Sequence, residues 1–314
     1  MRVCILKGDG IDSEPIGAAL RTIFGTPGVE DLSIPALLGD GLKNCHLLVV
    51  PGGRGSKYLA KNLGERGAEA IQRAVAHGMN YFGVCAGAAY AASGLRWHGI
   101  SLEESQHCLG LLPVTAVGPL PGIWPGQKFI VSQEMLVDTQ KMTHRALNLA
   151  GSSFEVQDGS QAKVLYRYHR GGAPAVVSAQ FGKGTVVGSG PHGEYTLSYL
   201  LNQKSYFSNV KTLETSERQP GDENYSLLRR EVPVFLSGLS PESDGFSHDF
   251  FSSILREAFG YQPTRRVSAL SEVAAGPLSR KVGMAPSDVI IAAAAEAARN
   301  VRLPRPPSVG GRLG

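Results

Sequence analysis

The sequence predicts an α/β protein with a doubly wound, mostly parallel sheet. Short apolar runs typical of buried strands recur along the first 90 residues, and segments with helical spacing separate them. This alternation predicts parallel strands with helices on both faces of the sheet. Ligands of such sheets bind at the carboxyl ends of the strands, so we look for the site there.

The elements of the first half follow from their apolar spacing. Ile16, Leu20 and Ile23 lie one helical turn apart, and 47–50 is continuously apolar, as in a strand buried on both faces. In chain order we expect strand 2–6, helix 13–24, strand 31–37, strand 47–50, helix 66–77 and strand 81–84.

The second half has a different character. Residues 110–126 are rich in Pro and Gly and predict a long surface loop near the site. Runs at 161–168, 175–181 and 185–188 predict a small antiparallel addition to the sheet. Helices expected at 249–259 and 288–302, the latter capped by Ser287, give a helical C-terminal extension, and the Pro-rich end from 303 predicts a disordered tail.

Composition narrows the function classes. The chain has 314 residues, 42% hydrophobic and 18% charged, which is ordinary for a globular protein. A formal net charge of +4 is too small to indicate nucleic-acid binding, and no run reaches the roughly 20 apolar residues of a membrane span. The first eight residues predict a strand and not a signal peptide. Four cysteines without a pattern predict a reducing compartment, by default the cytoplasm.

The strongest motif is Gly83–Ala88, in which Cys85 stands between an apolar strand and an Ala-rich helix start. The flanking Gly83 and Gly87 would let the chain turn sharply there. Such an elbow places the sulfur above the carboxyl end of the sheet, beside N–H groups that favour thiolate. We therefore predict that Cys85 is a nucleophile.

A base and an oxyanion site are available elsewhere in the chain. His192 and Glu194 follow the predicted strand 185–188, so His192 could take the thiol proton while Glu194 orients its ring. Gly52 and Gly53 end the predicted strand 47–50, and backbone N–H groups there and at Ala86 could bind an oxyanion. No Cys/His cluster has metal-ligand spacing and no phosphate loop is present, so we expect neither metal nor cofactor.

The order of these motifs resembles class I glutamine amidotransferase-like domains. Within that superfamily the chain most resembles the N-terminal region of fungal-type biotin-protein ligases, through Pro51–Gly53, Tyr81–Gly87, Tyr168–Gly172 and Gly190–Glu194. The resemblance implies a flavodoxin-like, amidotransferase-like fold and a Cys85–His192–Glu194 triad. It also makes His169 a candidate pocket residue, although an edge-strand position is the better explanation.

The extent of the resemblance divides the chain. We expect the amidotransferase-like domain at 1–202, an extension of the same domain at 203–262, and a helical segment with a disordered tail at 263–314. Nothing in the sequence resembles the catalytic module of biotin ligases. The chain is therefore not expected to be a complete ligase, and ligation would need another protein of the biotinylation system.

Two residues depart from the family pattern. Ala89 stands where glutamine-hydrolysing domains have the glutamine of GxCxGxQ, which questions glutamine as the substrate. Gly193 replaces the proline of His-Pro-Glu, which leaves both functional groups in place.

Three classes of function remain open. The first is a cysteine hydrolase that cleaves an amide of a small molecule through a thioester. The second is a non-catalytic domain that senses a ligand or regulates biotin-protein ligation. The third is a redox-sensing elbow cysteine, for which Glu14 is a candidate acidic neighbour. Cys4, Cys45 and Cys108 lack elbow spacing, so we expect them to be small core residues.

Overall fold

The computed structural model describes residues 1–97, 100–102, 108–120, 131–195 and 246–261. Within these ranges five strands form the parallel half of a large sheet: β1 (Val3–Lys7), β2 (Val29–Ser33), β3 (Leu47–Val50), β4 (Asn80–Val84) and β13 (Gly184–Ser189). They lie in the order β2-β1-β3-β4-β13, and each neighbouring pair is parallel. This order is that of a flavodoxin-like sheet, so the predicted fold class is confirmed.

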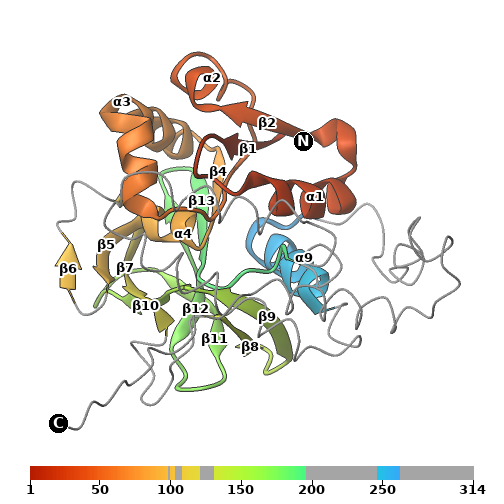
Figure 1. Ribbon diagram of the computed structural model, residues 1–314, viewed down its shortest axis with the longest axis vertical. Helices are drawn as coiled ribbons and strands as arrows, with labels where there is room; N and C mark the ends of the chain where they lie inside the picture. The colour runs from red at the N-terminus through yellow and green to blue at the C-terminus, as the bar shows by residue number, and fades with distance from the viewer. Residues whose placement is uncertain (98–99, 103–107, 121–130, 196–245, 262–314) are drawn as a thin grey trace, which may run out of the picture.

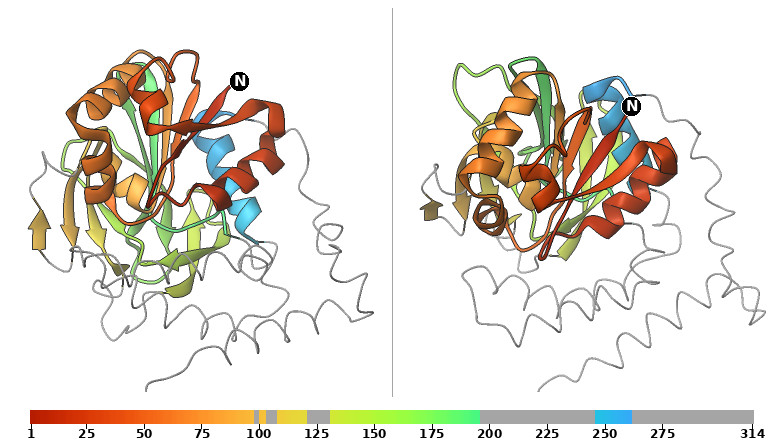
Figure 2. Two further views of the ribbon diagram at one scale, coloured as in Figure 1. Left: turned by 45° about the horizontal axis from the view of Figure 1, so that its top comes forward. Right: turned by 90° about the horizontal axis from the view of Figure 1, so that it is seen from above.

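Helices cover both faces of the parallel half (Figures 1 and 2). They are α1 (Ser13–Phe24), α2 (Ile34–Leu38), α3 (Ser56–Ala76), α4 (Ala86–Ala91) and α9 (Phe246–Phe259), with a 3-10 turn η1 (Thr26–Gly28). Cys4 and Leu6 of β1 join a core cluster with α2, α3 and α4, whereas Val3 and Ile5 join one with α1 and α9. Burial on both faces explains why these strands are continuously apolar.

Two elements of this half differ from the prediction. The expected strand 31–37 ends at Ser33, because the Ser33 hydroxyl accepts a hydrogen bond from Ala36 N (3.3 Å) and Pro35 lies in the first turn of α2. The helix expected at 66–77 begins already at Ser56 and has a kink at Gly64, whose φ is 60°.

The predicted antiparallel addition is present beyond β13. The strand expected at 185–188 is β13 itself, which was expected in the addition but pairs in parallel with β4 and is antiparallel only to β12. The strands of the addition are β12 (Pro174–Phe181), β11 (Lys163–Tyr168), β8 (Val131–Asp138) and β9 (Thr143–Leu149), which continue the large sheet in that order. A second sheet has the order β10-β7-β5-β6 and consists of β10 (Ser153–Val156), β7 (Leu112–Gly118), β5 (Ala92–Trp97) and β6 (Ile100–Leu102). The large sheet and this small one share a core cluster, in which Phe154 of β10 lies with Val177 of β12.

Strand β7 contradicts the loop predicted at 110–126. Its residues alternate between buried and half-buried positions, as in an ordinary strand. Pro113 fits because the register of β7 against β5 shifts between Ala92 and Gly94, beside that proline. Residues 121–126 of the predicted loop lie outside the described ranges.

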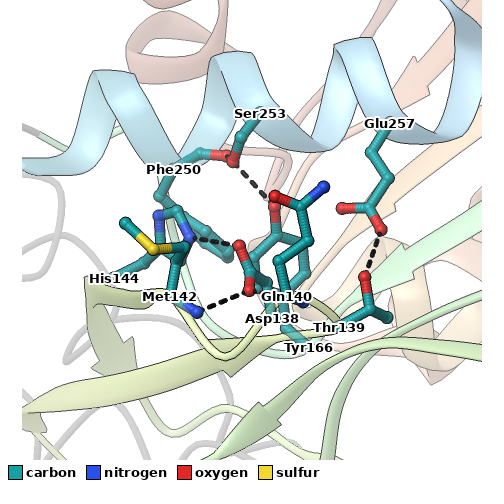
Figure 3. Close-up of polar contacts among 9 residues, drawn as sticks. All are labelled: Asp138, Thr139, Gln140, Met142, His144, Tyr166, Phe250, Ser253 and Glu257. Atoms are coloured by element: carbon teal, nitrogen blue, oxygen red, sulfur yellow. Dashed lines mark hydrogen bonds and ion pairs between the residues drawn. The ribbon is translucent and has the colours of Figure 1, made fainter.

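Helix α9 packs on the antiparallel addition (Figure 3). The Tyr166 hydroxyl lies 2.7 Å from the Ser253 hydroxyl, which in turn donates to the Phe250 carbonyl at 2.7 Å. At the other end of the contact Thr139 Oγ1 donates to Glu257 Oε1 at 3.3 Å. The helix predicted at 249–259 is thus present and begins at 246, whereas the helix predicted at 288–302 lies outside the described ranges.

The β8–β9 hairpin presents a preorganised surface to α9. The Asp138 carboxylate accepts hydrogen bonds from Gln140 N (2.9 Å), Met142 N (2.8 Å) and His144 Nε2 (3.0 Å). His144 then packs edge-on against the Tyr166 ring, with 5.3 Å between centroids. This network fixes the hairpin on which α9 lies.

None of the helices in the described ranges has the length and apolar character needed to cross a membrane.

We predict that Phe250→Ala destabilises the protein by about 3–5 kcal/mol, because it removes a fully buried ring. Arg256→Ala is the matched control on the exposed side of the same helix, and we expect it to change the unfolding free energy by less than about 0.5 kcal/mol. Urea denaturation of the full chain measures both values. Equal stability of the two variants would contradict the packing described for α9.

Candidate functional site

Cys85 occupies a strained backbone position between β4 and α4. Its φ is 52° and its ψ is −110°, a conformation that residues other than glycine rarely adopt. Two hydrogen bonds hold it there: Cys85 N donates to Ser189 O (2.8 Å), and Cys85 O accepts from Ala89 N (2.9 Å). The strand β13 and the helix α4 together therefore fix the position of the thiol.

The flanking glycines have a different role from the one predicted. Neither Gly83 nor Gly87 has a positive φ, so the sharp turn is made by Cys85 itself. A Cβ on Gly87 would lie 2.0 Å from Val50 O, and a Cβ on Gly83 would lie 2.4 Å from Gly87 O. Both positions require glycine because α4 packs backbone to backbone against β3 and β4.

His192 is fixed by its backbone and by a carboxylate. Its N–H donates to Leu147 O (2.7 Å), and its carbonyl accepts from Leu147 N (3.1 Å). Its Nδ1 lies 2.7 Å from Glu194 Oε1, and the two residues are only 4% and 3% exposed. Glu194 therefore orients the imidazole, which leaves Nε2 for chemistry.

The Cys85 thiol and the His192 imidazole both lie beside Gly52. A Cβ on Gly52 would lie 3.0 Å from His192 Cε1 and 3.8 Å from Cys85 Sγ, so any side chain there would fill the space beside both groups. Burial lowers the pKa of His192, but the Glu194 carboxylate and the Cys85 thiol together raise this pKa well above its usual value. The site thus favours a protonated imidazole beside the sulfur.

The other predicted oxyanion residues, Gly53 and Ala86, follow the carboxyl ends of the neighbouring strands β3 and β4. Gly53 pairs with Ile11 in an isolated antiparallel bridge, whose hydrogen bonds are Asp12 N to Gly52 O (3.0 Å) and Arg54 N to Gly10 O (3.0 Å). These bonds do not use the Gly53 N–H. Ala86 is the first residue of α4, directly after the nucleophile.

Gly193, which replaces the family's proline, is explained by α9. A Cβ at this position would lie 2.8 Å from Phe250 Cδ1 and 3.3 Å from Phe251 Cβ. The two phenylalanines therefore occupy the space of a side chain at 193 and support the His192–Glu194 segment from behind. This support comes from the helix that begins at residue 246.

Comparisons with known proteins bear on this arrangement. The family model described as biotin-protein ligase, N terminal, matches residues 4–121. A protein of Chlamydia muridarum (strain MoPn / Nigg), described as uncharacterized, is 30% identical over 197 residues, which cover 59% of this chain and 74% of the relative. The chain belongs to the biotin-protein ligase N-terminal family. Its amidotransferase-like domain is related to that region of the ligases, as the sequence predicted.

Solved structures with a similar fold include two glutamine amidotransferases. One crystal structure has a TM-score of 0.48 and 24% identity, and the match covers 62% of this chain and 91% of that chain. A second, from Thermotoga maritima, has a TM-score of 0.45 and 13% identity, with coverage of 82% and 97%. The family match itself includes Cys85 and Gly52–Gly53 but ends before His192 and Glu194, so those two residues are placed by the geometry alone.

Sequence reasoning missed four groups of this candidate site. Cys85 Sγ lies 3.9 Å from Leu149 O, at the end of β9, and the Tyr168 ring lies buried within electrostatic reach of Cys85. The third and fourth are Asp12 and Tyr195, whose side chains hydrogen-bond to each other. Asp12 directly precedes α1, and in the sequence such a position indicates only a helix cap.

Two weaker candidates are not brought into the site. The His169 side chain is exposed beyond the end of β11, although the neighbouring Tyr168 is fully buried. Glu14 is exposed in the first turn of α1. The acidic group that lies close to His192 and Glu194 is instead Asp12, two residues earlier.

We predict that Gly87→Ala destabilises the protein by about 1–3 kcal/mol, because a Cβ there overlaps the β3 backbone. Gly28→Ala serves as the control: its Cβ would have no neighbour nearer than Met1 O at 3.4 Å, and we expect a change below about 0.5 kcal/mol. Chemical denaturation monitored by circular dichroism gives both values. A Gly87→Ala protein as stable as Gly28→Ala would show that α4 does not need this close approach.

Proposed function

We propose that the protein is a cysteine hydrolase that cleaves an amide of a small molecule through a thioester on Cys85. The observation that carries the proposal is the buried His192–Glu194 pair, whose imidazole meets the thiol at Gly52. A protonated imidazole beside a thiolate is the ion pair that cysteine nucleophiles use. A purely structural cysteine has no need of a strained backbone and a buried, oriented histidine.

The proposed reaction assigns one role to each group. The Cys85 sulfur attacks the carbonyl carbon, and backbone N–H groups of Gly53 and Ala86 stabilise the negative oxygen. His192 gives its proton to the departing amine, the carbon–nitrogen bond breaks, and the thioester forms. Water, deprotonated by His192, then hydrolyses the thioester to the carboxylic acid and restores the thiol. Glu194 keeps the imidazole in the required orientation throughout.

The substrate class is wider than glutamine. Ala89 is buried in α4, and its methyl group stands where glutamine-hydrolysing relatives have a side-chain amide. It therefore offers no side-chain hydrogen bond to a substrate. We expect a small carboxamide, in a reducing compartment such as the cytoplasm, since all four cysteines are free thiols.

A second candidate is a non-catalytic domain that senses a ligand for biotin-protein ligation. The family match and Ala89 favour it, because accessory domains keep a site's geometry without its turnover. On this reading another protein of the biotinylation system is the partner.

The two candidates make opposite predictions for Cys85→Ser. If the protein is a hydrolase, it releases ammonia from members of a panel of small carboxamides, glutamine included, and Cys85→Ser lowers the rate at least about a hundredfold. Intact-mass spectrometry should detect the acyl group on Cys85 during turnover. Cys108→Ser, which changes another partly buried thiol, should keep the wild-type rate.

A ligand-sensing domain gives a different result in the same assay. A carboxamide or a biotin-like ligand then raises the melting temperature of both wild type and Cys85→Ser, and no ammonia or acyl adduct is detected. That result would contradict the hydrolase proposal.

A further inference from the structure

Asp12 occupies the N-cap position of α1 but does not cap the helix. Aspartate at this position ordinarily accepts a hydrogen bond from a backbone N–H of the first turn. The Asp12 side chain makes no such bond, and its carboxylate instead accepts one from the Tyr195 hydroxyl, 183 positions further along the chain. Its backbone N–H donates to Gly52 O at 3.0 Å. The backbone of Asp12 thus contacts Gly52 of the Cys85 site, and its side chain contacts Tyr195.

Tyr195 connects Asp12 to the catalytic imidazole. It directly follows Glu194 and is buried, and its ring lies against that of His192 with 5.1 Å between centroids and 59° between planes. The tyrosine therefore touches the imidazole with its ring and the carboxylate with its hydroxyl. Asp12 and His192 are therefore linked through the side chain of Tyr195.

The charges around Asp12 belong to the same site. The pKa of Asp12 is raised to about 6, chiefly by burial. The Tyr195 hydrogen bond and the charge of His192 lower this pKa, whereas Glu194 and Glu14 raise it. Asp12 therefore lies within electrostatic reach of the imidazole, whose own pKa is raised by Glu194 and Cys85. One oxygen of Glu194, Oε2, has no hydrogen-bond partner among the described residues, so part of its charge is uncompensated within the site.

We propose that Asp12 is a positioning residue for His192: through Tyr195 it fixes the imidazole ring, and its negative charge stabilises the protonated imidazole. The inference rests on the proposed function, because the proton on His192 is the one that the leaving amine takes. It adds a second acidic group to the predicted triad.

The test is the titration of His192 in three proteins without substrate. Histidines are labelled with carbon-13, the His192 Cε1–H signal is assigned by its loss in His192→Ala, and its chemical shift is followed against pH. Asp12→Asn removes the charge but keeps an oxygen for the Tyr195 hydroxyl. Asp9→Asn is the control, because Asp9 lies on the same loop and accepts a hydrogen bond from a tyrosine hydroxyl, that of Tyr58 at 2.7 Å.

We expect the pH at which His192 loses its proton to fall by about one unit in Asp12→Asn, since an opposite charge nearby is lost. Asp9→Asn should leave it unchanged. An equal midpoint in all three proteins would overturn the inference. The titration involves no turnover, so a failed hydrolase assay and a failed titration are separate results.

Tyr195→Phe keeps the inference testable if Asp12→Asn does not fold. It retains the ring against His192 and removes the hydroxyl that anchors Asp12. The His192 midpoint should fall in this variant too, by less than in Asp12→Asn. An unchanged midpoint in Tyr195→Phe would contradict the linkage through the tyrosine.

The pH dependence of stability gives an independent check. Because the pKa of Asp12 is raised in the folded protein, the folded state binds the proton more tightly than the unfolded state does. The stability due to that proton is complete below about pH 4 and is lost as the pH rises through about 6. The melting temperature of Asp12→Asn relative to wild type should therefore rise between pH 4 and pH 8, and a constant difference would contradict the raised pKa of Asp12.

Discussion

The contact on which this site depends is the approach of the α4 backbone to the strands β3 and β4. At Gly87 and Gly83 there is no room for even one methyl group. The helix can lie this close only because the turn before it is made in a single residue, and Cys85 takes the strained φ that makes that turn possible. The strain is maintained by hydrogen bonds to Ser189 and Ala89, so the position of Cys85 is a consequence of sheet and helix packing.

The antiparallel strands and α9 hold the His192 segment in place. Leu147 of β9 fixes the His192 backbone, and the last residue of the same strand, Leu149, places its carbonyl oxygen near the thiol. Helix α9 rests on the β8–β9 hairpin and fills the space behind Gly193 with Phe250. The parallel half thus positions Cys85, Gly52–Gly53 and, in the segment after β13, His192 and Glu194, while the antiparallel half and α9 support that segment.

The parallel half could be predicted well because its strands are buried on both faces. Leu47–Val50 is apolar at every position, and α1 shows a clear apolar stripe, so their bounds agree with the prediction. Strand β7 could not be predicted in this way, because Pro113 indicates a loop unless the bulge beside it is known. The strand predicted at 31–37 was wrong beyond residue 33. Ser33 caps a helix there, and the helix lies within an apolar run that resembles a strand.

The residues of the site also differ in whether a local sequence motif identifies them. Cys85, His192 and Glu194 carry local motifs, and the structure brings them together. Asp12 carries none, because its role depends on Tyr195, 183 positions away, and its place before α1 suggests a cap. Gly83 and Gly87 were identified as necessary for the wrong reason, since close packing between backbones cannot be read from one segment.

The central claim is that Cys85 and His192 form a working thiolate–imidazolium pair. The most direct test is the rate at which each of the four cysteines reacts with iodoacetamide at neutral pH, read by peptide mass spectrometry in wild type and His192→Ala. The account predicts that Cys85 reacts faster than Cys4, Cys45 and Cys108, and that its rate falls at least about tenfold without His192. A Cys85 that reacts no faster than the buried Cys4, with no effect of His192→Ala, would contradict it.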